Sequence, residues 1–236
     1  PEDFWQEVSN DIFWFKKPTK ILNKSNPPFY KWFEDGVTNT CYNALDLHID
    51  EGRGEKLALI YDSPITGSKK QFTYSELKKK VSKFAGALRA QGVNKGDRVI
   101  IYMPMIPEAV IAMLACGRIG AIHSVVFGGF ASSELASRID DSKAKILITA
   151  SCGFEPGKTI KYKPLVDDAI KMASHKVEKL IFFQRPGNEV KINAPKEVSW
   201  DEVLSNAKEV DCVEMNSNDL AYILYTSGTT GVPKGI

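Results

Sequence analysis

The sequence lacks the marks of several broad classes of protein. In its 236 residues no apolar run reaches about 18 residues, so no membrane-spanning helix is expected. The formal net charge is only +2, which is too small to predict a nucleic acid or an anionic membrane as a partner. The four cysteines (Cys41, Cys116, Cys152 and Cys212) lack the spacing of metal ligands or of a disulfide framework. We therefore expect a reducing compartment, either the cytoplasm or the mitochondrial matrix.

Neither end of the chain carries a start or targeting signal. It begins at Pro1 and has no signal peptide and no Arg-rich presequence. We expect it to be a piece of a longer protein. Its 43% of hydrophobic and 25% of charged residues are typical of a globular protein with a substantial core.

The most informative segment is YTSGTTGVPKGI at residues 225–236, which combines three glycines, four hydroxyl side chains and one lysine. Glycines let backbone N–H groups turn toward an anion, hydroxyls add donors, and a lysine adds a positive charge. The pattern predicts a loop that binds a polyphosphate. The predicted phosphate-binding residues are Thr226, Ser227, Gly228, Thr229, Thr230, Gly231 and Lys234.

Two other interpretations of this segment are a Walker A motif and a flexible linker. It is not a Walker A motif, because Pro233 stands in place of the second glycine and Gly235 follows Lys234 in place of Ser or Thr. A flexible linker is the alternative, but a linker seldom follows an apolar run such as residues 220–225. We expect that run to be a buried parallel strand that leads into the loop.

The chain divides into an arm and a larger body. Residues 1–50 are irregular and rich in aromatics, and we expect an N-terminal arm whose aromatic side chains pack against the body. In residues 51–236 a hairpin (57–61 with 71–74) precedes strands at 99–102, 121–127, 145–149, 180–183 and 220–225. Helices are expected after Thr73, from Pro107, and over 132–140, 164–175 and 200–207. This alternation predicts an α/β fold with a mostly parallel sheet flanked by helices.

Ligands of such sheets bind at the carboxyl ends of the strands. Three polar turns follow predicted strands: Gly128-Gly129, the turn that contains Gly153, Gly157 and Lys158, and the terminal segment. Each turn alone is weak evidence, because glycine in a strand-to-helix turn often serves geometry only. Together they predict a long ligand, or two ligands, along one edge of the sheet.

Longer stretches of the chain resemble one family. The segments WFEDG (32–36), CYNALD (41–46), YMPMIPE (102–108), MLAC (113–116) and RIGAIHSVVFGGF (118–130) resemble the short-chain acyl-CoA synthetases, that is, the acetyl- and propionyl-CoA synthetase group. The segments EPGK (155–158) and YKPLVD (162–167) lean toward the propionyl branch. The terminal segment resembles the phosphate loop of the wider group of adenylate-forming enzymes. The resemblance runs over essentially all of this chain and over only the front part of the family's chain.

The resemblance implies a ligation in two steps. A short-chain carboxylate attacks the α-phosphate of ATP, which gives an acyl-adenylate and pyrophosphate, and the thiol of coenzyme A then displaces AMP. ATP, Mg²⁺ and coenzyme A are therefore implied, with the carboxylate as the further substrate. The implied fold is the front portion of the large N-terminal domain of an adenylate-forming enzyme, in which the loop at 226–234 binds the β,γ-phosphates of ATP.

The resemblance also implies where coenzyme A docks. In the family its nucleotide end lies against the positions of Phe127, Gly128 and Gly129, and against the turn of Glu155, Pro156, Gly157 and Lys158. The family commonly has two arginines where this chain has Glu155 and Lys158. Lys158 is able to pair with a phosphate, whereas Glu155 would repel one.

The family's adenine, ribose and acyl contacts and its adenylating lysine lie beyond Ile236. We therefore expect no catalytic and no metal-binding residue within this chain, and we expect the chain by itself to be inactive. The identity of the acid stays open. The alternatives are another adenylate-forming enzyme, such as a medium-chain acyl-CoA ligase, and a non-catalytic module that binds a nucleotide or coenzyme A.

Overall fold

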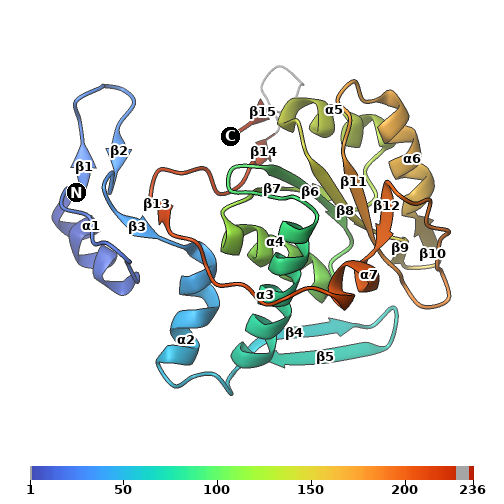
Figure 1. Cartoon of the computed structure of the whole chain (residues 1–236), viewed down its shortest axis with the longest axis horizontal. Helices are drawn as coiled ribbons and strands as arrows, with labels where there is room; N and C mark the ends of the chain where they lie inside the picture. Colours follow the sequence, from blue (N-terminus) through green and yellow to red (C-terminus); the bar gives the residue numbers. More distant parts are fainter. Residues whose placement is uncertain (1, 227–233) are drawn as a thin grey trace.

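The core of the protein is a five-stranded parallel sheet with the strand order β12-β11-β8-β6-β7 (Figure 1). A computed structural model describes residues 2–226 and 234–236. The strands are β6 (Arg98–Met103), β7 (Ile122–Phe127), β8 (Ile146–Ala150), β11 (Lys179–Phe183) and β12 (Glu197–Ser199). Every neighbouring pair is parallel, and β8 is buried along its whole length because helices cover both faces. The predicted α/β fold with a parallel sheet is confirmed.

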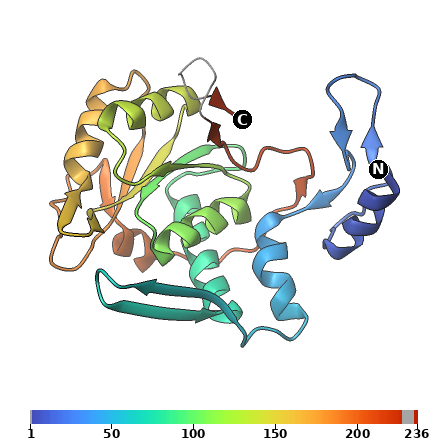
Figure 2. The same ribbon diagram turned by 180° about the vertical axis from the view of Figure 1, so that it is seen from behind.

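Helices cover the two faces of the sheet in separate groups. One face carries α3 (Tyr74–Ala90), α4 (Pro107–Ile119) and α7 (Trp200–Ser205), and the other carries α5 (Ser132–Ser142) and α6 (Tyr162–Met172) (Figures 1 and 2). The predicted start signals hold, since Thr73 and Glu76 form a capping box at α3 and Pro107 opens α4. The predicted hairpin is β4 (Leu57–Ser63) with β5 (Ser68–Thr73), and it lies beside α3.

The first 50 residues lie to one side of this body (Figures 1 and 2). They contain α1 (Glu2–Val8), a 3₁₀ turn at Ser9–Asp11, a π-helical turn at Tyr42–Asp46 and α2 (Leu47–Asp50). The short strands β1 (Leu22–Asn23) and β2 (Lys31–Trp32) pair with each other, and β3 (Val37–Thr38) pairs with β13 (Met215–Asn216). The expectation that the aromatics pack against the body is wrong for several of them: Phe4, Trp5, Phe29 and Tyr30 are exposed. Trp5 packs edge-on against Trp32 at 5.8 Å, because these short elements contact each other more than the sheet.

A buried ion pair joins this N-terminal region to the body. The guanidinium of Arg118, on α4, binds the Asp46 carboxylate through two nitrogens at 2.7 and 3.0 Å, and its Nε donates to the carbonyl of Val210 at 2.6 Å. The side chains of Arg118 and Asp46 are only 1% and 7% exposed. Lys78 of α3 adds a second cation 3.2 Å from Asp46. Four separate stretches of sequence therefore meet at one charged centre.

The apolar run at 220–225 is not the buried strand that the sequence predicts. Leu220 is 68% exposed, and Tyr222 and Leu224 are exposed as well. The run touches the sheet through a single parallel bridge between Tyr222 and His123 at the edge strand β7. The regular strands here are the two-residue β14 (Tyr225–Thr226) and β15 (Lys234–Gly235), which pair antiparallel. The run lies at the edge of the five-stranded sheet, where, among the described residues, only the short strand β15 pairs with its end at Tyr225. The described residues therefore leave many of its side chains uncovered.

Two shorter elements were not predicted from the sequence. Strand β12 has three residues, too few for a period of two to be read, and it is held as a strand by its parallel pairing with β11. The turn after β8 forms a hairpin of β9 (Cys152–Glu155) and β10 (Lys158–Lys161). Among the residues that the structure describes, no helix has the length and apolarity needed to cross a membrane.

Replacing Asp46 by alanine should lower the free energy of unfolding by roughly 3–5 kcal/mol, because it leaves the Arg118 guanidinium buried without its carboxylate. The matched control is Asp62→Ala, which removes an exposed pair with Lys69 at 3.1 Å and should change stability little. Urea or thermal unfolding measures both variants. A loss for Asp46→Ala as small as that for Asp62→Ala would contradict the role given to the buried pair.

Candidate functional site

A groove of about 350 Å³ lies at the carboxyl ends of β6 and β7. The tip of the β4–β5 hairpin and the β9–β10 hairpin form its other walls. Its volume is within the range of small-molecule sites, and its position is the one expected for ligands of an open parallel sheet. The residues that line it include Ile65, Met103, Phe127, Gly128, Glu155 and Arg185. The structure thus brings three predicted residues, Phe127, Gly128 and Glu155, into the lining of one groove.

Gly128 and Gly153 are needed for close packing around Tyr162. A Cβ on Gly128 would lie 2.4 Å from the Tyr162 hydroxyl and 2.6 Å from the Met103 carbonyl oxygen, and one on Gly153 would lie 2.5 Å from the same hydroxyl. Burial raises the pKa of Tyr162 above its ordinary value, so the phenol stays protonated at neutral pH. These glycines bring the strand ends of β7 and β9 together at the base of the groove.

The hairpin of β9 and β10 carries Glu155 and Lys158, at the two positions where the resemblance implies arginines. Gly157 has φ +74°, a conformation that favours glycine, and follows Pro156 in the turn. The Lys158 ammonium lies 2.9 Å from a Glu155 carboxylate oxygen, and both side chains are largely exposed. The negative charge of Glu155 therefore has a cation beside it, which offsets part of the expected repulsion of a phosphate. Gly129 has φ +105°, and a Cβ added to it would lie 4.0 Å from a carboxylate oxygen of Glu155.

Arg185 is a lining residue that the sequence analysis missed. It follows β11, is only 8% exposed, and holds its guanidinium over the Phe154 ring at 4.7 Å. Among the described residues no carboxylate forms an ion pair with it, and it is the one arginine in the groove lining. A buried cation without an anionic partner is costly unless a ligand completes it. Its position in the sequence could have identified it, because Arg185 lies just beyond the carboxyl end of a predicted strand. Ligands of parallel sheets bind at that end of the strands.

The two ends of the predicted phosphate-binding segment lie together. Thr226 and Lys234 are directly opposed in the β14–β15 ladder, which puts their side chains on the same face. Tyr225 anchors this ladder to α5, because its hydroxyl donates to Asp141 at 2.5 Å and its ring lies under Arg138 at 4.4 Å. The other predicted residues, Ser227, Gly228, Thr229, Thr230 and Gly231, lie outside the described residues. Neither Thr226 nor Lys234 lines the groove.

His123 lies outside the groove, on the edge strand. Its ring is 5.7 Å from that of Tyr222, and its buried Nδ1 has no hydrogen-bond partner among the described residues. Burial lowers the pKa of His123 to about 4. The imidazole is therefore neutral at physiological pH and packs at the junction of β7 with the terminal run.

These features define two candidate binding sites on the body. The groove offers apolar walls and one buried cation, which suits a ligand that carries both an apolar part and an anionic group. The β14–β15 ladder presents a lysine and a threonine at the mouth of a segment rich in glycine and hydroxyls. Both sites favour anions, and their described residues include no pair of groups arranged for acid–base catalysis.

The whole chain is similar to known proteins. Residues 48–236 match the family model of the AMP-binding enzymes, and residues 1–44 match the acetyl-coenzyme A synthetase N-terminus. The human mitochondrial acyl-CoA synthetase short-chain family member 3 is 52% identical over 237 aligned residues, which cover 100% of this chain and 34% of that protein. The acetyl-coenzyme A synthetase of Streptomyces avermitilis is 47% identical over 234 residues, covering 99% of this chain and 36% of the relative.

A solved structure gives the same result for the fold. The acetoacetyl-CoA synthetase from Streptomyces lividans superposes with a TM-score of 0.88 at 26% identity, over 100% of this chain and 36% of that one. The chain thus spans about a third of the length of the relatives that it matches. The resemblance to the short-chain acyl-CoA synthetases is confirmed along the whole chain, and the chain belongs to the family of AMP-binding enzymes.

Proposed function

We propose that the full-length protein is an ATP-dependent, AMP-forming ligase that joins a short-chain carboxylate to coenzyme A. The observation that carries the proposal is the β14–β15 ladder, which holds Lys234 opposite Thr226 at the two ends of the glycine-rich segment. A cation and a hydroxyl at this place suit the β,γ-phosphates of ATP, bound as its magnesium complex. The similarity to two short-chain synthetases along the whole chain supports the same activity.

In the first step a carboxylate oxygen attacks the α-phosphate of ATP and pyrophosphate leaves. Lys234 and the segment before it hold the departing phosphates in line and offset the negative charge that grows on them. Tyr225 contributes by fixing the start of the segment to α5 through Asp141. In the second step the thiol of coenzyme A attacks the acyl carbonyl carbon and AMP leaves with the bonding electron pair.

The groove is our candidate for the nucleotide end of coenzyme A. Phe127 is largely exposed at its wall and offers a ring face for a base, while Gly128 leaves the backbone open to close approach. Arg185 supplies a buried cation for a phosphate. Glu155 is a carboxylate and is unable to fill this role, and the charge of Lys158 is partly offset by its ion pair with Glu155. Gly129, Pro156 and Gly157 set the shape of the two turns.

The arrangement also supports a division of the chain and a compartment. We infer that residues 1–50 are an arm, and that residues 51–236 form the α/β subdomain ending in the phosphate-binding loop. The four cysteines are free thiols, which fits a reducing compartment such as the cytoplasm or the mitochondrial matrix. The chemistry proposed needs only small-molecule partners.

A substrate panel tests the proposed function. The full-length protein is incubated with ATP, coenzyme A and acetate, propionate or longer acids, and AMP, pyrophosphate and acyl-CoA are measured separately. Equal amounts of the three products with a short acid are expected. Formation of ADP and phosphate, or a preference for medium-chain acids, would replace this proposal with another ligase. Binding of nucleotide or coenzyme A without turnover would favour the non-catalytic module.

Lys234→Ala should slow acyl-adenylate formation roughly 10- to 1000-fold, because one charged contact to the developing pyrophosphate is lost. The thioester step, started from a supplied acyl-adenylate, should change little because pyrophosphate has already left. The control is Lys79→Ala on the exposed face of α3. Exchange of labelled pyrophosphate into ATP and acyl-CoA formation measure the two steps. An equal fall in both steps with an intact fold would mean that Lys234 does not serve the phosphates.

Arg185→Gln should raise the KM for coenzyme A about 10- to 100-fold, the loss expected for one charge-assisted hydrogen bond to a phosphate. Pyrophosphate exchange should stay near the wild-type rate, because coenzyme A enters only after the adenylate has formed. Arg53→Gln, at a site remote from the groove lining, is the control. Steady-state kinetics with varied coenzyme A give the comparison, and an unchanged KM in a folded Arg185 variant would exclude this role.

A further inference from the structure

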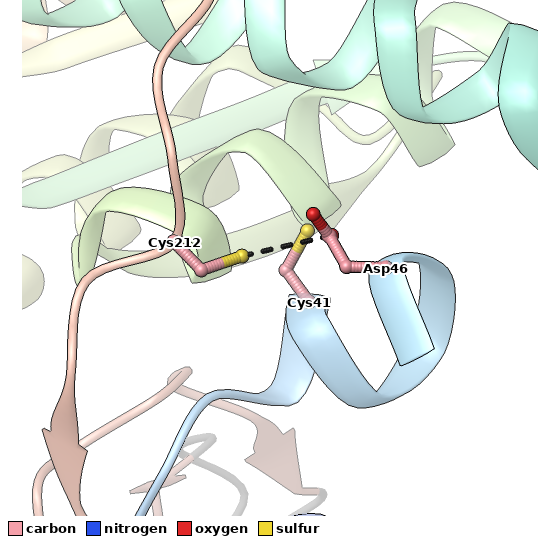
Figure 3. A group of neighbouring side chains, drawn as sticks. All are labelled: Cys41, Asp46 and Cys212. Carbon is pink, nitrogen blue, oxygen red and sulfur yellow. Dashed lines mark hydrogen bonds between the residues drawn. The ribbon is translucent and has the colours of Figure 1, made fainter. Parts of the chain in front are cut away.

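Two of the four cysteines lie together at the junction between the N-terminal region and the body. Cys41 directly precedes the π-helical turn, and Cys212 lies in the extended segment between α7 and β13. Their Sγ atoms and a carboxylate oxygen of Asp46 all lie within 4.8 Å of one another. Figure 3 shows the Cys212 thiol directed at the Asp46 carboxylate, with the Cys41 sulfur beside this contact. Residues distant in sequence thus place two sulfur atoms at one point.

Positive charge makes this cluster unsuited to a metal ion. Arg118 binds both oxygens of Asp46, and Lys78 approaches the same carboxylate at 3.2 Å. The Arg118 Nη1 also lies 3.1 Å from the Cys212 sulfur and 3.7 Å from the Cys41 sulfur. A divalent cation would have to enter next to this guanidinium and compete with it for the same ligands, and like charges at such distances repel. The cluster is therefore better suited to the chemistry of the thiols themselves.

The surroundings favour a reactive sulfur at this position. A nearby guanidinium stabilises a thiolate. The Cys212 thiol donates to Asp46 Oδ2 at 3.8 Å. Contact with Cys212 and the charge of Arg118 hold the pKa of Cys41 below its ordinary value, whereas contact with Cys41 and burial raise the pKa of Cys212, so Cys41 is the better proton acceptor of the two. Burial alone raises the pKa of Cys116 to about 12 and also raises that of Cys152. Cys212 is only partly buried, whereas Cys41, Cys116 and Cys152 are buried, so Cys212 is the cysteine nearest to solvent.

We propose that Cys41 and Cys212 form a reversible disulfide with a small-molecule disulfide, such as glutathione disulfide, as the oxidant. Cys212 attacks one sulfur of the oxidant, its proton passes to Cys41 or to water, and one glutathione leaves as a thiolate. The Cys41 sulfur then attacks Cys212, breaks the mixed disulfide, and releases the second glutathione. Two protein thiols and one glutathione disulfide become one protein disulfide and two glutathione thiols.

The bond would fasten together segments that already contact each other. The Cys212 segment passes along α3, where the Lys208 carbonyl fits against Gly86, and continues into β13, which pairs with β3. A link to Cys41 adds a covalent tie between the N-terminal region and the stretch that leads to Tyr225. In a reducing compartment such a tie is transient and reports the redox state.

The test uses the full-length protein, reduced and then freed of reductant. It is incubated at neutral pH with glutathione disulfide, unreacted thiols are alkylated after denaturation, and tryptic peptides are analysed by mass spectrometry. The expected product is a peptide pair joined through Cys41 and Cys212 that dithiothreitol separates. Cys116 and Cys152 should be recovered mainly as alkylated thiols. Repeating the reaction in urea should abolish this selectivity, because the fold that brings the two sulfurs together is lost.

Variants of the chain's own cysteines sharpen the result. Cys212→Ser should leave Cys41 as a free thiol, Cys41→Ser should leave Cys212 as a mixed disulfide with glutathione, and Cys152→Ser should keep the cross-link. In the native wild-type protein, a stable mixed disulfide at Cys212 with Cys41 still free would overturn the proposal. An unreacted Cys212, or pairing of either residue with another cysteine, would overturn it as well.

Discussion

The buried ion pair between Arg118 and Asp46 is the interaction on which the arrangement of the chain depends. Burying both charges is costly, and the cost is offset here because two guanidinium nitrogens bind the carboxylate and Nε binds the Val210 carbonyl. Asn39 strengthens the same junction, since its side-chain amide donates to the Gly117 carbonyl at 2.9 Å and to the Val213 carbonyl at 2.8 Å. Helix α4, the N-terminal region and the segment at 208–214 are thereby held in one relative position.

That position decides where the phosphate-binding segment begins. The segment at 208–214 crosses α3, where Gly86 leaves room for the Lys208 carbonyl, and then pairs through β13 with β3. From there the chain reaches the edge strand β7 and delivers Tyr225 to α5. The ladder that carries Thr226 and Lys234 thus depends on a junction on the other side of the sheet (Figure 2). The same junction holds the two sulfur atoms of Cys41 and Cys212.

In the groove, residues that are needed for packing lie next to residues that are placed to contact a ligand. Gly128 and Gly153 are small because Tyr162 fills the space beside them, whereas Phe127 and Arg185 line the open space of the groove. The Glu155–Lys158 pair at the rim leaves little net charge there. The buried Arg185 is then the strongest positive centre of the groove, which moves the expected anion contact from the exposed turn to the interior.

The sequence by itself determined the α/β alternation, the capping box at Thr73, the hairpin before it and the turns that follow the parallel strands. These follow from short-range periodicity and turn chemistry, which act between residues a few positions apart. Only the tertiary structure decided that residues 220–225 lie at an exposed edge, that Arg185 lines the groove, and that Arg118 pairs with Asp46. Each of these depends on strand order and on contacts between residues distant in sequence, because a side chain's neighbours and its burial are set only when the layers pack.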